Sequence, residues 1–239
     1  MNSSLSAPCA PRLRTLRRIS AAMLLMWGLS ACGVSRVDGV SVSWPSFKSG
    51  APLVLPSDPA QCPDLAGAYR AQGEFRAGEP TATLKDLHTF FVYPLDLPGM
   101  RDTPLPEWQS SDGATVTLSP DGMGWQVLAV DGKGARSRGR LPMQNGAQDL
   151  TALSGESRMD RPDRIERHTG CTQGRLWVSV RHDWRQHEAM GVRRHVAMFR
   201  QEAGGLLVTV GRESDTLGLL PWYSNESSVA QYWFAPAPR

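Results

Sequence analysis

Cys32 is a nucleophilic side chain whose surroundings suit enzymatic processing. Its thiol can form a thioether with a lipid, and the two residues before it, Ser30 and Ala31, are small enough for the narrow cleft of a peptidase. An apolar run, Ile19 to Leu29, precedes them, and the segment before that run is positive through Arg12, Arg14, Arg17 and Arg18. A helix over residues 19–31 would be about 20 Å long, too short for the ~30 Å hydrocarbon core of a bilayer. The stretch predicts a cleaved targeting segment over residues 1–31.

The tetrapeptide Leu29-Ser30-Ala31-Cys32 resembles the lipobox of bacterial lipoproteins. The resemblance implies that Cys32 receives a diacylglyceryl group, that cleavage follows Ala31, and that fatty acids such as palmitate hold the chain in a membrane of the cell envelope. Gly33, where an aspartate would favour the inner membrane, implies the outer membrane, with the protein facing the periplasm. The alternative is an ordinary cleaved signal peptide with a cysteine beside it.

Charge and cysteine content narrow the possible functions. The 239 residues carry a formal net charge of +3, but residues 1–31 remove four arginines and no acid, which leaves 22 basic and 23 acidic side chains. This balance gives no argument for nucleic-acid binding, and we expect no nucleic-acid partner. Cys9 leaves with the targeting segment and Cys32 takes lipid, so Cys62 and Cys171 predict one disulfide in an oxidising compartment, with two separately buried thiols as the alternative.

The mature chain divides into a tether and one domain. Residues 32–61 are rich in serine and proline, which predicts a lipidated N-terminus followed by a flexible tether. Trp44, Phe47 and the run Leu53-Val54-Leu55 are unusual for a solvated linker and leave docking on the domain or at the membrane open. Residues 62–239 are predicted to form a single β-rich periplasmic domain. Its opening, Cys62 to Tyr69, resembles that of uncharacterised proteobacterial envelope lipoproteins, and Gly67-Ala68-Tyr69 is similar to the Gly-x-Trp of lipocalin barrels.

Hydrophobic periodicity predicts a mainly β fold. Apolar residues at helical spacing predict one short helix over residues 81–91. From residue 114 onward the period is two, with turns at residues 119–122, 131–134 and 203–205. The pattern is typical of antiparallel sheet that forms a barrel-like or sandwich domain.

Two groups of side chains are candidate sites. Arg136, Arg138 and Arg140 alternate along one predicted strand and share a face, which suits anionic headgroups or an acidic glycan; the alternative is a solvated strand protected from edge pairing. A histidine group over residues 182–195 contains His182, His187 and His195. The group suits acid–base or metal chemistry if His182 and His195 meet across a hairpin. The alternative is that these histidines are surface residues of the hairpin. A basic and acidic run, residues 158–167, is expected to be an exposed connection.

These observations favour a non-enzymatic role. The sequence has no Gly-x-Ser-x-Gly elbow, Walker loop or Gly-x-Gly-x-x-Gly motif, and we predict no catalytic residues, no metal and no cofactor. The first hypothesis is an outer-membrane-anchored lipoprotein that acts as a non-catalytic binding or interaction module of the cell envelope, with an envelope protein or an anionic glycan as a possible partner. The alternatives are a carrier of small hydrophobic ligands or lipids inside a barrel, and an envelope hydrolase that uses the 182–195 region.

Overall fold

The computed structural model describes residues 34–97, 99, 100, 108, 110, 113–122, 124–143, 146–149, 164–186, 188–218 and 222–238, with the backbone alone at 142 and 146–149. Cys32 and the predicted targeting segment lie outside these residues. The compact unit begins at Val34 and therefore includes the residues predicted to be a tether.

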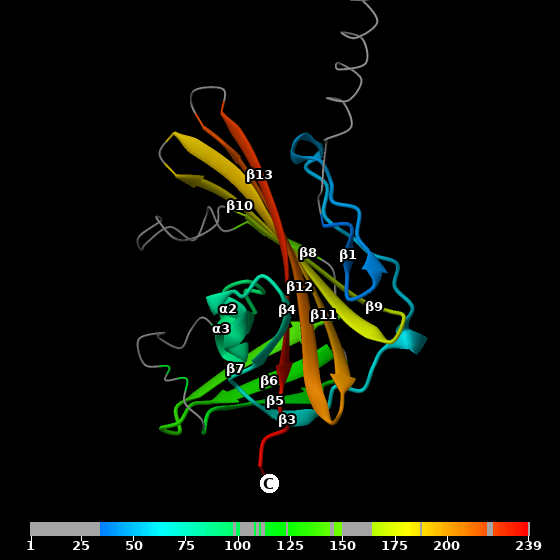
Figure 1. Ribbon diagram of the computed structural model, residues 1–239, viewed down its shortest axis with the longest axis vertical. Helices are drawn as coiled ribbons and strands as arrows, with labels where there is room; N and C mark the ends of the chain where they lie inside the picture. Colours follow the sequence, from blue (N-terminus) through cyan, green and yellow to red (C-terminus); the bar gives the residue numbers. More distant parts are fainter. Residues whose placement is uncertain are drawn as a thin grey trace, which may run out of the picture. The chain divides into compact units, whose positions relative to one another are not determined.

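Two antiparallel sheets form a sandwich-like fold (Figure 1). The larger sheet has the strand order β4 (Glu74–Gly78), β13 (Tyr223–Phe234), β12 (Gly205–Leu217), β11 (Ala189–Glu202), β10 (Arg175–Gln186), β9 (Arg164–Thr172) and β8 (Gly146–Asp149). The smaller sheet has the order β3 (Gly67–Arg70), β5 (Thr115–Pro120), β6 (Gly124–Val130) and β7 (Arg136–Pro142). The mainly β, antiparallel prediction is confirmed, and within the described residues the strands form a sandwich rather than a closed barrel.

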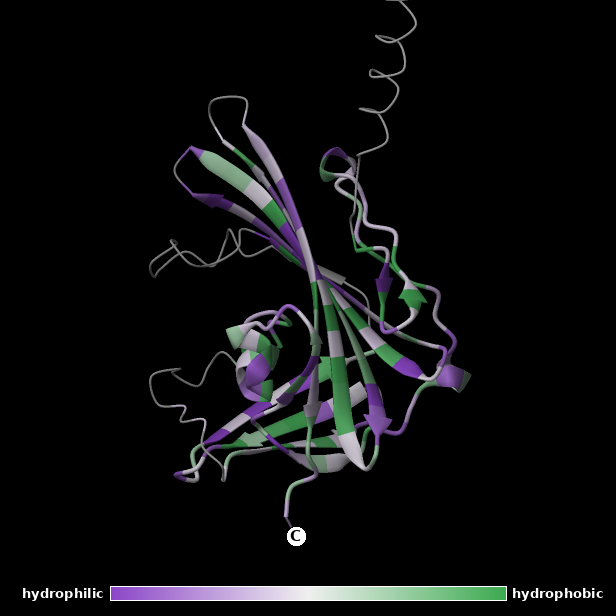
Figure 2. Ribbon diagram, viewed as in Figure 1, coloured by the Kyte–Doolittle hydropathy of each residue, from purple (hydrophilic) through white to green (hydrophobic). Residues whose placement is uncertain are grey.

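The inner faces of the two sheets enclose the main core. On β10 the alternation of Leu176, Val178 and Val180 points apolar side chains inward, and β12 does the same with Leu206 and Val208. The β11–β12 turn is tight because Ala203 and Gly204 both adopt positive φ, 50° and 77°, which suits the right-handed twist of a hairpin. Figure 2 shows the hydrophobic residues concentrated in the half of the long strands that faces the helices and the smaller sheet.

Two short helices, rather than the one predicted, fill the side of the sandwich: α2 (Ala82–Lys85) and α3 (Leu87–Val92). Asp86 is extended (φ −113°, ψ 120°) and separates them, while its carboxylate accepts a hydrogen bond from the Thr89 N–H and caps α3. The rings of Phe90 and Phe91 lie 6.2 and 6.1 Å from that of Phe199 on β11, so the helices pack on the inner face of the larger sheet.

The prediction of a flexible tether is wrong for residues 34–61. A small hairpin, β1 (Arg36–Val37) and β2 (Val40–Ser41), begins this segment, and the short 3-10 helices η1 (Phe47–Ser49) and η2 (Pro59–Gln61) follow. Five of its apolar side chains are buried against Trp177, Val196 and Met198 on the outer face of the larger sheet: Val37, Val40, Val42, Leu53 and Leu55. The hydrophobic effect thus gives the sheet a second core on its other side.

The exposed connection predicted over residues 158–167 is corrected where the structure describes it. Arg164–Thr172 is strand β9, with Ile165 and Cys171 directed into the main core. Arg164 and His168 both contact Glu166 at 3.0 Å on the outer face, so alternating charges here mark a strand rather than a loop. Residues 158–163 lie outside the described part.

Candidate functional site

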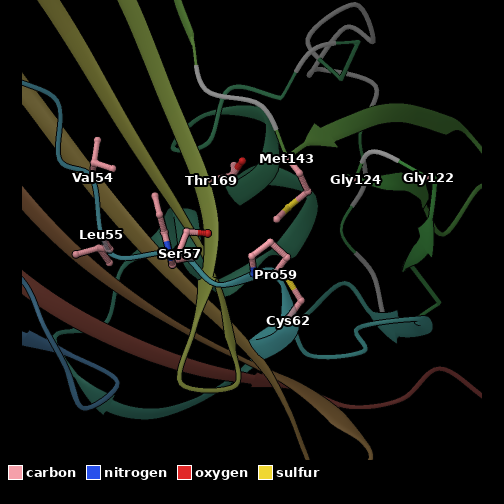
Figure 3. Close-up of a pocket in the computed structure, with 10 residues that line it drawn as sticks. Val54, Leu55, Ser57, Pro59, Cys62, Gly122, Gly124, Met143 and Thr169 are labelled. Atoms are coloured by element: carbon pink, nitrogen blue, oxygen red, sulfur yellow. The ribbon is translucent and has the colours of Figure 1, made fainter.

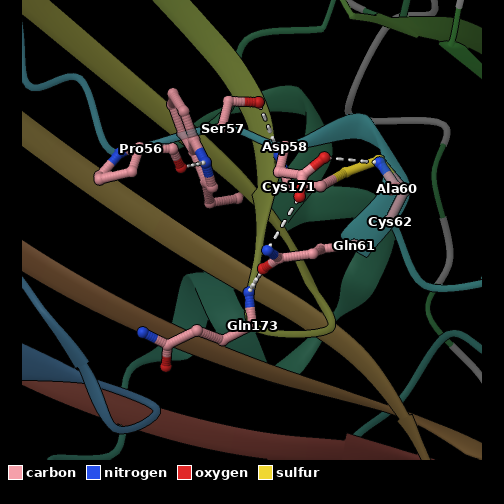
Figure 4. The surroundings of a disulfide bond; sticks show 9 residues. Pro56, Ser57, Asp58, Ala60, Gln61, Cys62, Cys171 and Gln173 are labelled. Carbon is pink, nitrogen blue, oxygen red and sulfur yellow. Dashed lines mark hydrogen bonds between the residues drawn. A yellow bond between two sulfur atoms is a disulfide. The ribbon is translucent and has the colours of Figure 1, made fainter.

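A strap, defined as residues 51–62, crosses the free edge of β9 and is fixed to it by a disulfide. Cys62 and Cys171 are bonded, which confirms the predicted pairing, and they are 109 residues apart in sequence (Figure 4). The Asp58 N–H donates to the Cys171 carbonyl at 2.8 Å, and the Cys171 N–H donates to Ser57 Oγ at 3.1 Å. Strand β8 pairs only with the Arg164 to Arg167 part of β9. The strap therefore provides hydrogen-bond partners for backbone groups on the remaining open edge of β9.

Further hydrogen bonds position the middle and the C-terminal end of the strap. The Trp177 indole Nε1–H donates to the Pro56 carbonyl at 3.1 Å, and the Gln173 N–H donates to Gln61 Oε1 at 2.6 Å. Asp58 caps η2 through a bond from the Ala60 N–H at 3.0 Å. The strap is therefore an ordered part of the domain (Figure 4).

Gly170 on β9 lets the strap approach the sheet closely. A Cβ added at this position would lie 2.4 Å from Ser57 Oγ and 2.7 Å from the Trp177 ring. Both distances are far inside van der Waals contact, so only glycine allows the strap and the indole to meet here.

A cavity of about 410 Å³ lies beside the strap, where β9 meets the end of β7 and the β5–β6 turn (Figure 3). Its walls come from three parts of the chain: the strap, the larger sheet and the smaller sheet. The lining residues are Val54, Leu55, Ser57, Pro59, Cys62, Gly122, Gly124, Met143, Thr169 and Trp177. This volume lies within the ~300–1,000 Å³ range of small-molecule pockets.

The lining of this cavity suits an uncharged molecule or the apolar part of an amphipathic one. None of its ten residues carries a charge, and Cys62 is held in the disulfide. Val54 is 52% exposed and stands at the rim, whereas Trp177 is 1% exposed and forms part of the floor. Ser57 and Thr169 supply hydroxyl oxygens, so apolar surface with a few polar groups is what a ligand would meet.

The predicted arginine patch lies elsewhere, on β7 at the edge of the smaller sheet. Arg136, Arg138 and Arg140 are all exposed, and the predicted shared face is confirmed. Arg140 pairs with Asp121 at 2.8 Å, so one of the three charges is neutralised. The patch lies on an edge strand and borders no cavity described for this chain.

The histidine group is brought together in part. His182 on β10 and His195 on β11 lie with their ring centroids 5.9 Å apart, which confirms the predicted meeting across a hairpin. His187 lies outside the described residues. Asp183 points to the opposite face, where Arg181 binds it at 2.7 Å, and no cluster of three or more metal-ligating His, Cys, Asp or Glu side chains occurs among the residues placed by the structure.

No protein-family model and no curated protein matches this chain. The chain's function must therefore be argued from its own geometry. Among the described residues, no helix is long and apolar enough to cross a membrane.

The sequence singled out only part of the strap cavity. The Leu53-Val54-Leu55 run was recognised as unusual for a linker, and Cys62 was identified through its disulfide. Met143 and Gly124 gave no signal, because their role depends on how the smaller sheet is placed against β9.

Proposed function

We propose that this protein is a lipid-anchored, non-catalytic binding module of the bacterial cell envelope that holds a small apolar or amphipathic molecule in the strap cavity. The observation that supports it is the cavity of about 410 Å³ that a disulfide-fixed segment borders and whose described lining residues are uncharged. This combines the first sequence hypothesis with the ligand class of the carrier alternative, but places the ligand at the sandwich edge instead of inside a barrel. The described lining residues include no ionisable side chain that could act as a general acid or base or activate the hydroxyl groups of Ser57 and Thr169, which favours binding over hydrolysis.

The disulfide and the lipobox both favour an envelope location. Disulfides persist in the periplasm and are rare in the cytosol. Two or three acyl chains on Cys32 would hold the protein at a membrane almost permanently. We place it in the outer membrane, facing the periplasm.

The anchor gives the first prediction. Cys32→Ser is expected to abolish palmitate incorporation and to leave the chain at its precursor size, because serine cannot form the thioether. Cys9→Ser, a matched change in the same segment, should leave both unchanged. Labelled-palmitate uptake and gel size in membrane fractions measure this, and membrane retention of Cys32→Ser at the normal processed size would refute the anchor.

The cavity gives the second prediction. The apolar fluorescent probe N-phenyl-1-naphthylamine is expected to bind the full-length protein saturably, and Val54→Glu is expected to weaken it roughly 30-fold, since a carboxylate at the rim costs about 2 kcal/mol. Met190→Glu is the matched control, because Met190 is 42% exposed and is not a lining residue of the cavity. Fluorescence titration measures both dissociation constants. Absence of saturable binding, or equal weakening by the two variants, would contradict the proposed ligand site.

A further inference from the structure

The long strands β10–β12 carry a second group of cationic side chains on their inner face, beyond the main core. In the register, His195 lies opposite Arg212 and His182 lies opposite Arg193, so the four side chains form adjacent rows on one face. In Figure 1 this half of the strands extends past α2 and α3. Four basic side chains thus gather where the sheet leaves the core.

The two arginines of this group lack carboxylate partners. Neither Arg193 nor Arg212 forms an ion pair or side-chain hydrogen bond with any residue that the structure describes. Desolvation by the surrounding sheet and then the charge of nearby Arg212 lower the pKa of Arg193. Glu226 is the nearest acid in that row, but Ser214 stands between it and Arg193 in the register.

The neighbouring residue Arg194 shows what a structural arginine looks like in this sheet. Arg194 faces the opposite side, where its Nη1 binds Glu213 at 3.1 Å and Asp215 at 2.7 Å. The same three strands therefore supply two carboxylates to the outer face and none to Arg193 or Arg212. A bound anion would balance the positive charge that Arg193 and Arg212 place on this face.

A small cavity opens at this group. It has a volume of about 40 Å³ and is lined by His195 and Arg212, by the hydroxyl residues Thr81, Thr83 and Ser228, and by apolar side chains of α2, α3, β12 and β13. His195 is only 7% exposed, and its buried Nδ1 has no hydrogen-bond partner. The volume exceeds that of a single water site, and the polar lining offers several donors to one oxyanion.

We infer that this cavity, with Arg212, His195 and Arg193, is a binding site for a phosphate oxyanion, either free or carried by a lipid headgroup. Guanidinium groups bind phosphate oxygens with two parallel N–H bonds, and the hydroxyl groups of Thr83 and Ser228 can donate to the remaining oxygens. His195 stays uncharged, since burial and then the nearby cations His182, Arg212 and Arg193 lower its pKa well below the ordinary value; it would act as a neutral donor. The site shares no lining residue with the strap cavity.

The test uses the full-length protein and inorganic phosphate in isothermal titration calorimetry, with chloride held constant. Wild type is expected to bind one phosphate, and Arg212→Gln is expected to weaken binding at least tenfold. Arg136→Gln removes the same charge from the exposed β7 patch and should change the affinity less than twofold. Thermal unfolding shows whether Arg212→Gln is folded. If it is not, Arg193→Gln tests the site instead: this position is exposed, and its substitution is also expected to lower the affinity for phosphate.

A second arm separates the sources of the phosphate. Flotation compares vesicles of phosphatidic acid in phosphatidylcholine with vesicles of phosphatidylcholine alone, using residues 34–239, the compact unit without the lipidated cysteine and the apolar targeting segment. Arg212-dependent binding to phosphatidic acid without binding of free phosphate identifies a lipid headgroup, and the converse identifies a soluble anion. The inference is overturned if wild type binds neither, or if Arg136→Gln weakens binding as much as Arg212→Gln. Arg212→Gln and Arg193→Gln are expected to leave naphthylamine binding at the strap cavity unchanged. A negative result for phosphate therefore does not contradict the proposed function, and the reverse also holds.

Discussion

Replacing both Cys62 and Cys171 with alanine is expected to lower the free energy of unfolding by about 4–5 kcal/mol. The bond joins residues 109 apart, and closure of a loop of ~100 residues removes that much chain entropy from the unfolded state. It also fixes the strap to β9, where a few hydrogen bonds and the packing of Leu53 and Leu55 would remain. The double variant should therefore lose stability and naphthylamine binding together.

Urea unfolding of the full-length protein, followed by tryptophan fluorescence, measures this loss. Cys62→Ala alone is expected to lose the same free energy, because either change removes the cross-link. A thiol reductant added to wild type should reproduce the variant. A loss below about 1 kcal/mol would mean that the strap holds without the bond and that its packing dominates.

The second large effect on stability is expected from Arg194, the buried arginine on β11. Arg194 is 1% exposed, and Arg194→Met would leave the carboxylate of Asp215 buried without its cation. Loss of one partner of a buried pair costs about 3–5 kcal/mol. We expect about 3 kcal/mol, because Nη1 alone makes both ion pairs while Nε and Nη2 of Arg194 are buried without partners.

Arg140→Met is the matched control for this prediction. Arg140 forms its ion pair with Asp121 on the surface, where such pairs contribute less than about 1 kcal/mol. Urea unfolding of the two variants measures the difference. Equal losses of unfolding free energy in Arg194→Met and Arg140→Met would show that burial adds nothing to the ion pair of Arg194 with Asp215.

The same pair predicts the direction of acid sensitivity. Burial alone would raise the pKa of Asp215, but hydrogen bonds from Tyr223, Asn225 and Arg194 outweigh it and lower the pKa below 3.8. A carboxyl group whose pKa is lower in the folded state contributes stability above its unfolded pKa and loses it as the pH falls through the folded value. In Arg194→Met the folded-state pKa of Asp215 rises, so less stability should be lost on acidification than in wild type, which urea unfolding of both proteins at neutral and acid pH measures.

Local chemistry made much of the fold predictable. The β6–β7 turn forms as predicted, since Asp131 accepts bonds from the N–H groups of Lys133 and Ala135 within its own loop. A period of two indicated strands β10 to β13 of the larger sheet, which the structure extends, but it did not indicate β4, β8 or β9. Cys62 and Cys171 could be paired by elimination once the other cysteines were assigned.

The parts that sequence did not predict depend on contacts between distant residues. The run Leu53-Val54-Leu55 left docking on the domain or at the membrane open, and only Trp177 and Met198 explain why Leu53 and Leu55 are buried. On β9 the arginines at spacing three suggested a loop. The strand became evident only from the packing of Ile165 and Cys171 in the core between the two sheets. The cationic cavity required β11, β12 and the helices to be placed together.

The docking of residues 34–61 on the larger sheet has a consequence for how the chain reaches its final form. Pro56 meets Trp177 across 121 residues, so a segment that reaches the folding compartment early waits for strands that arrive late. Contacts of such high sequence separation slow folding to the millisecond-to-second range. Until β10–β12 are complete, Leu53, Leu55 and the sheet face that receives them remain uncovered, and this interval is when the nascent protein is most open to aggregation.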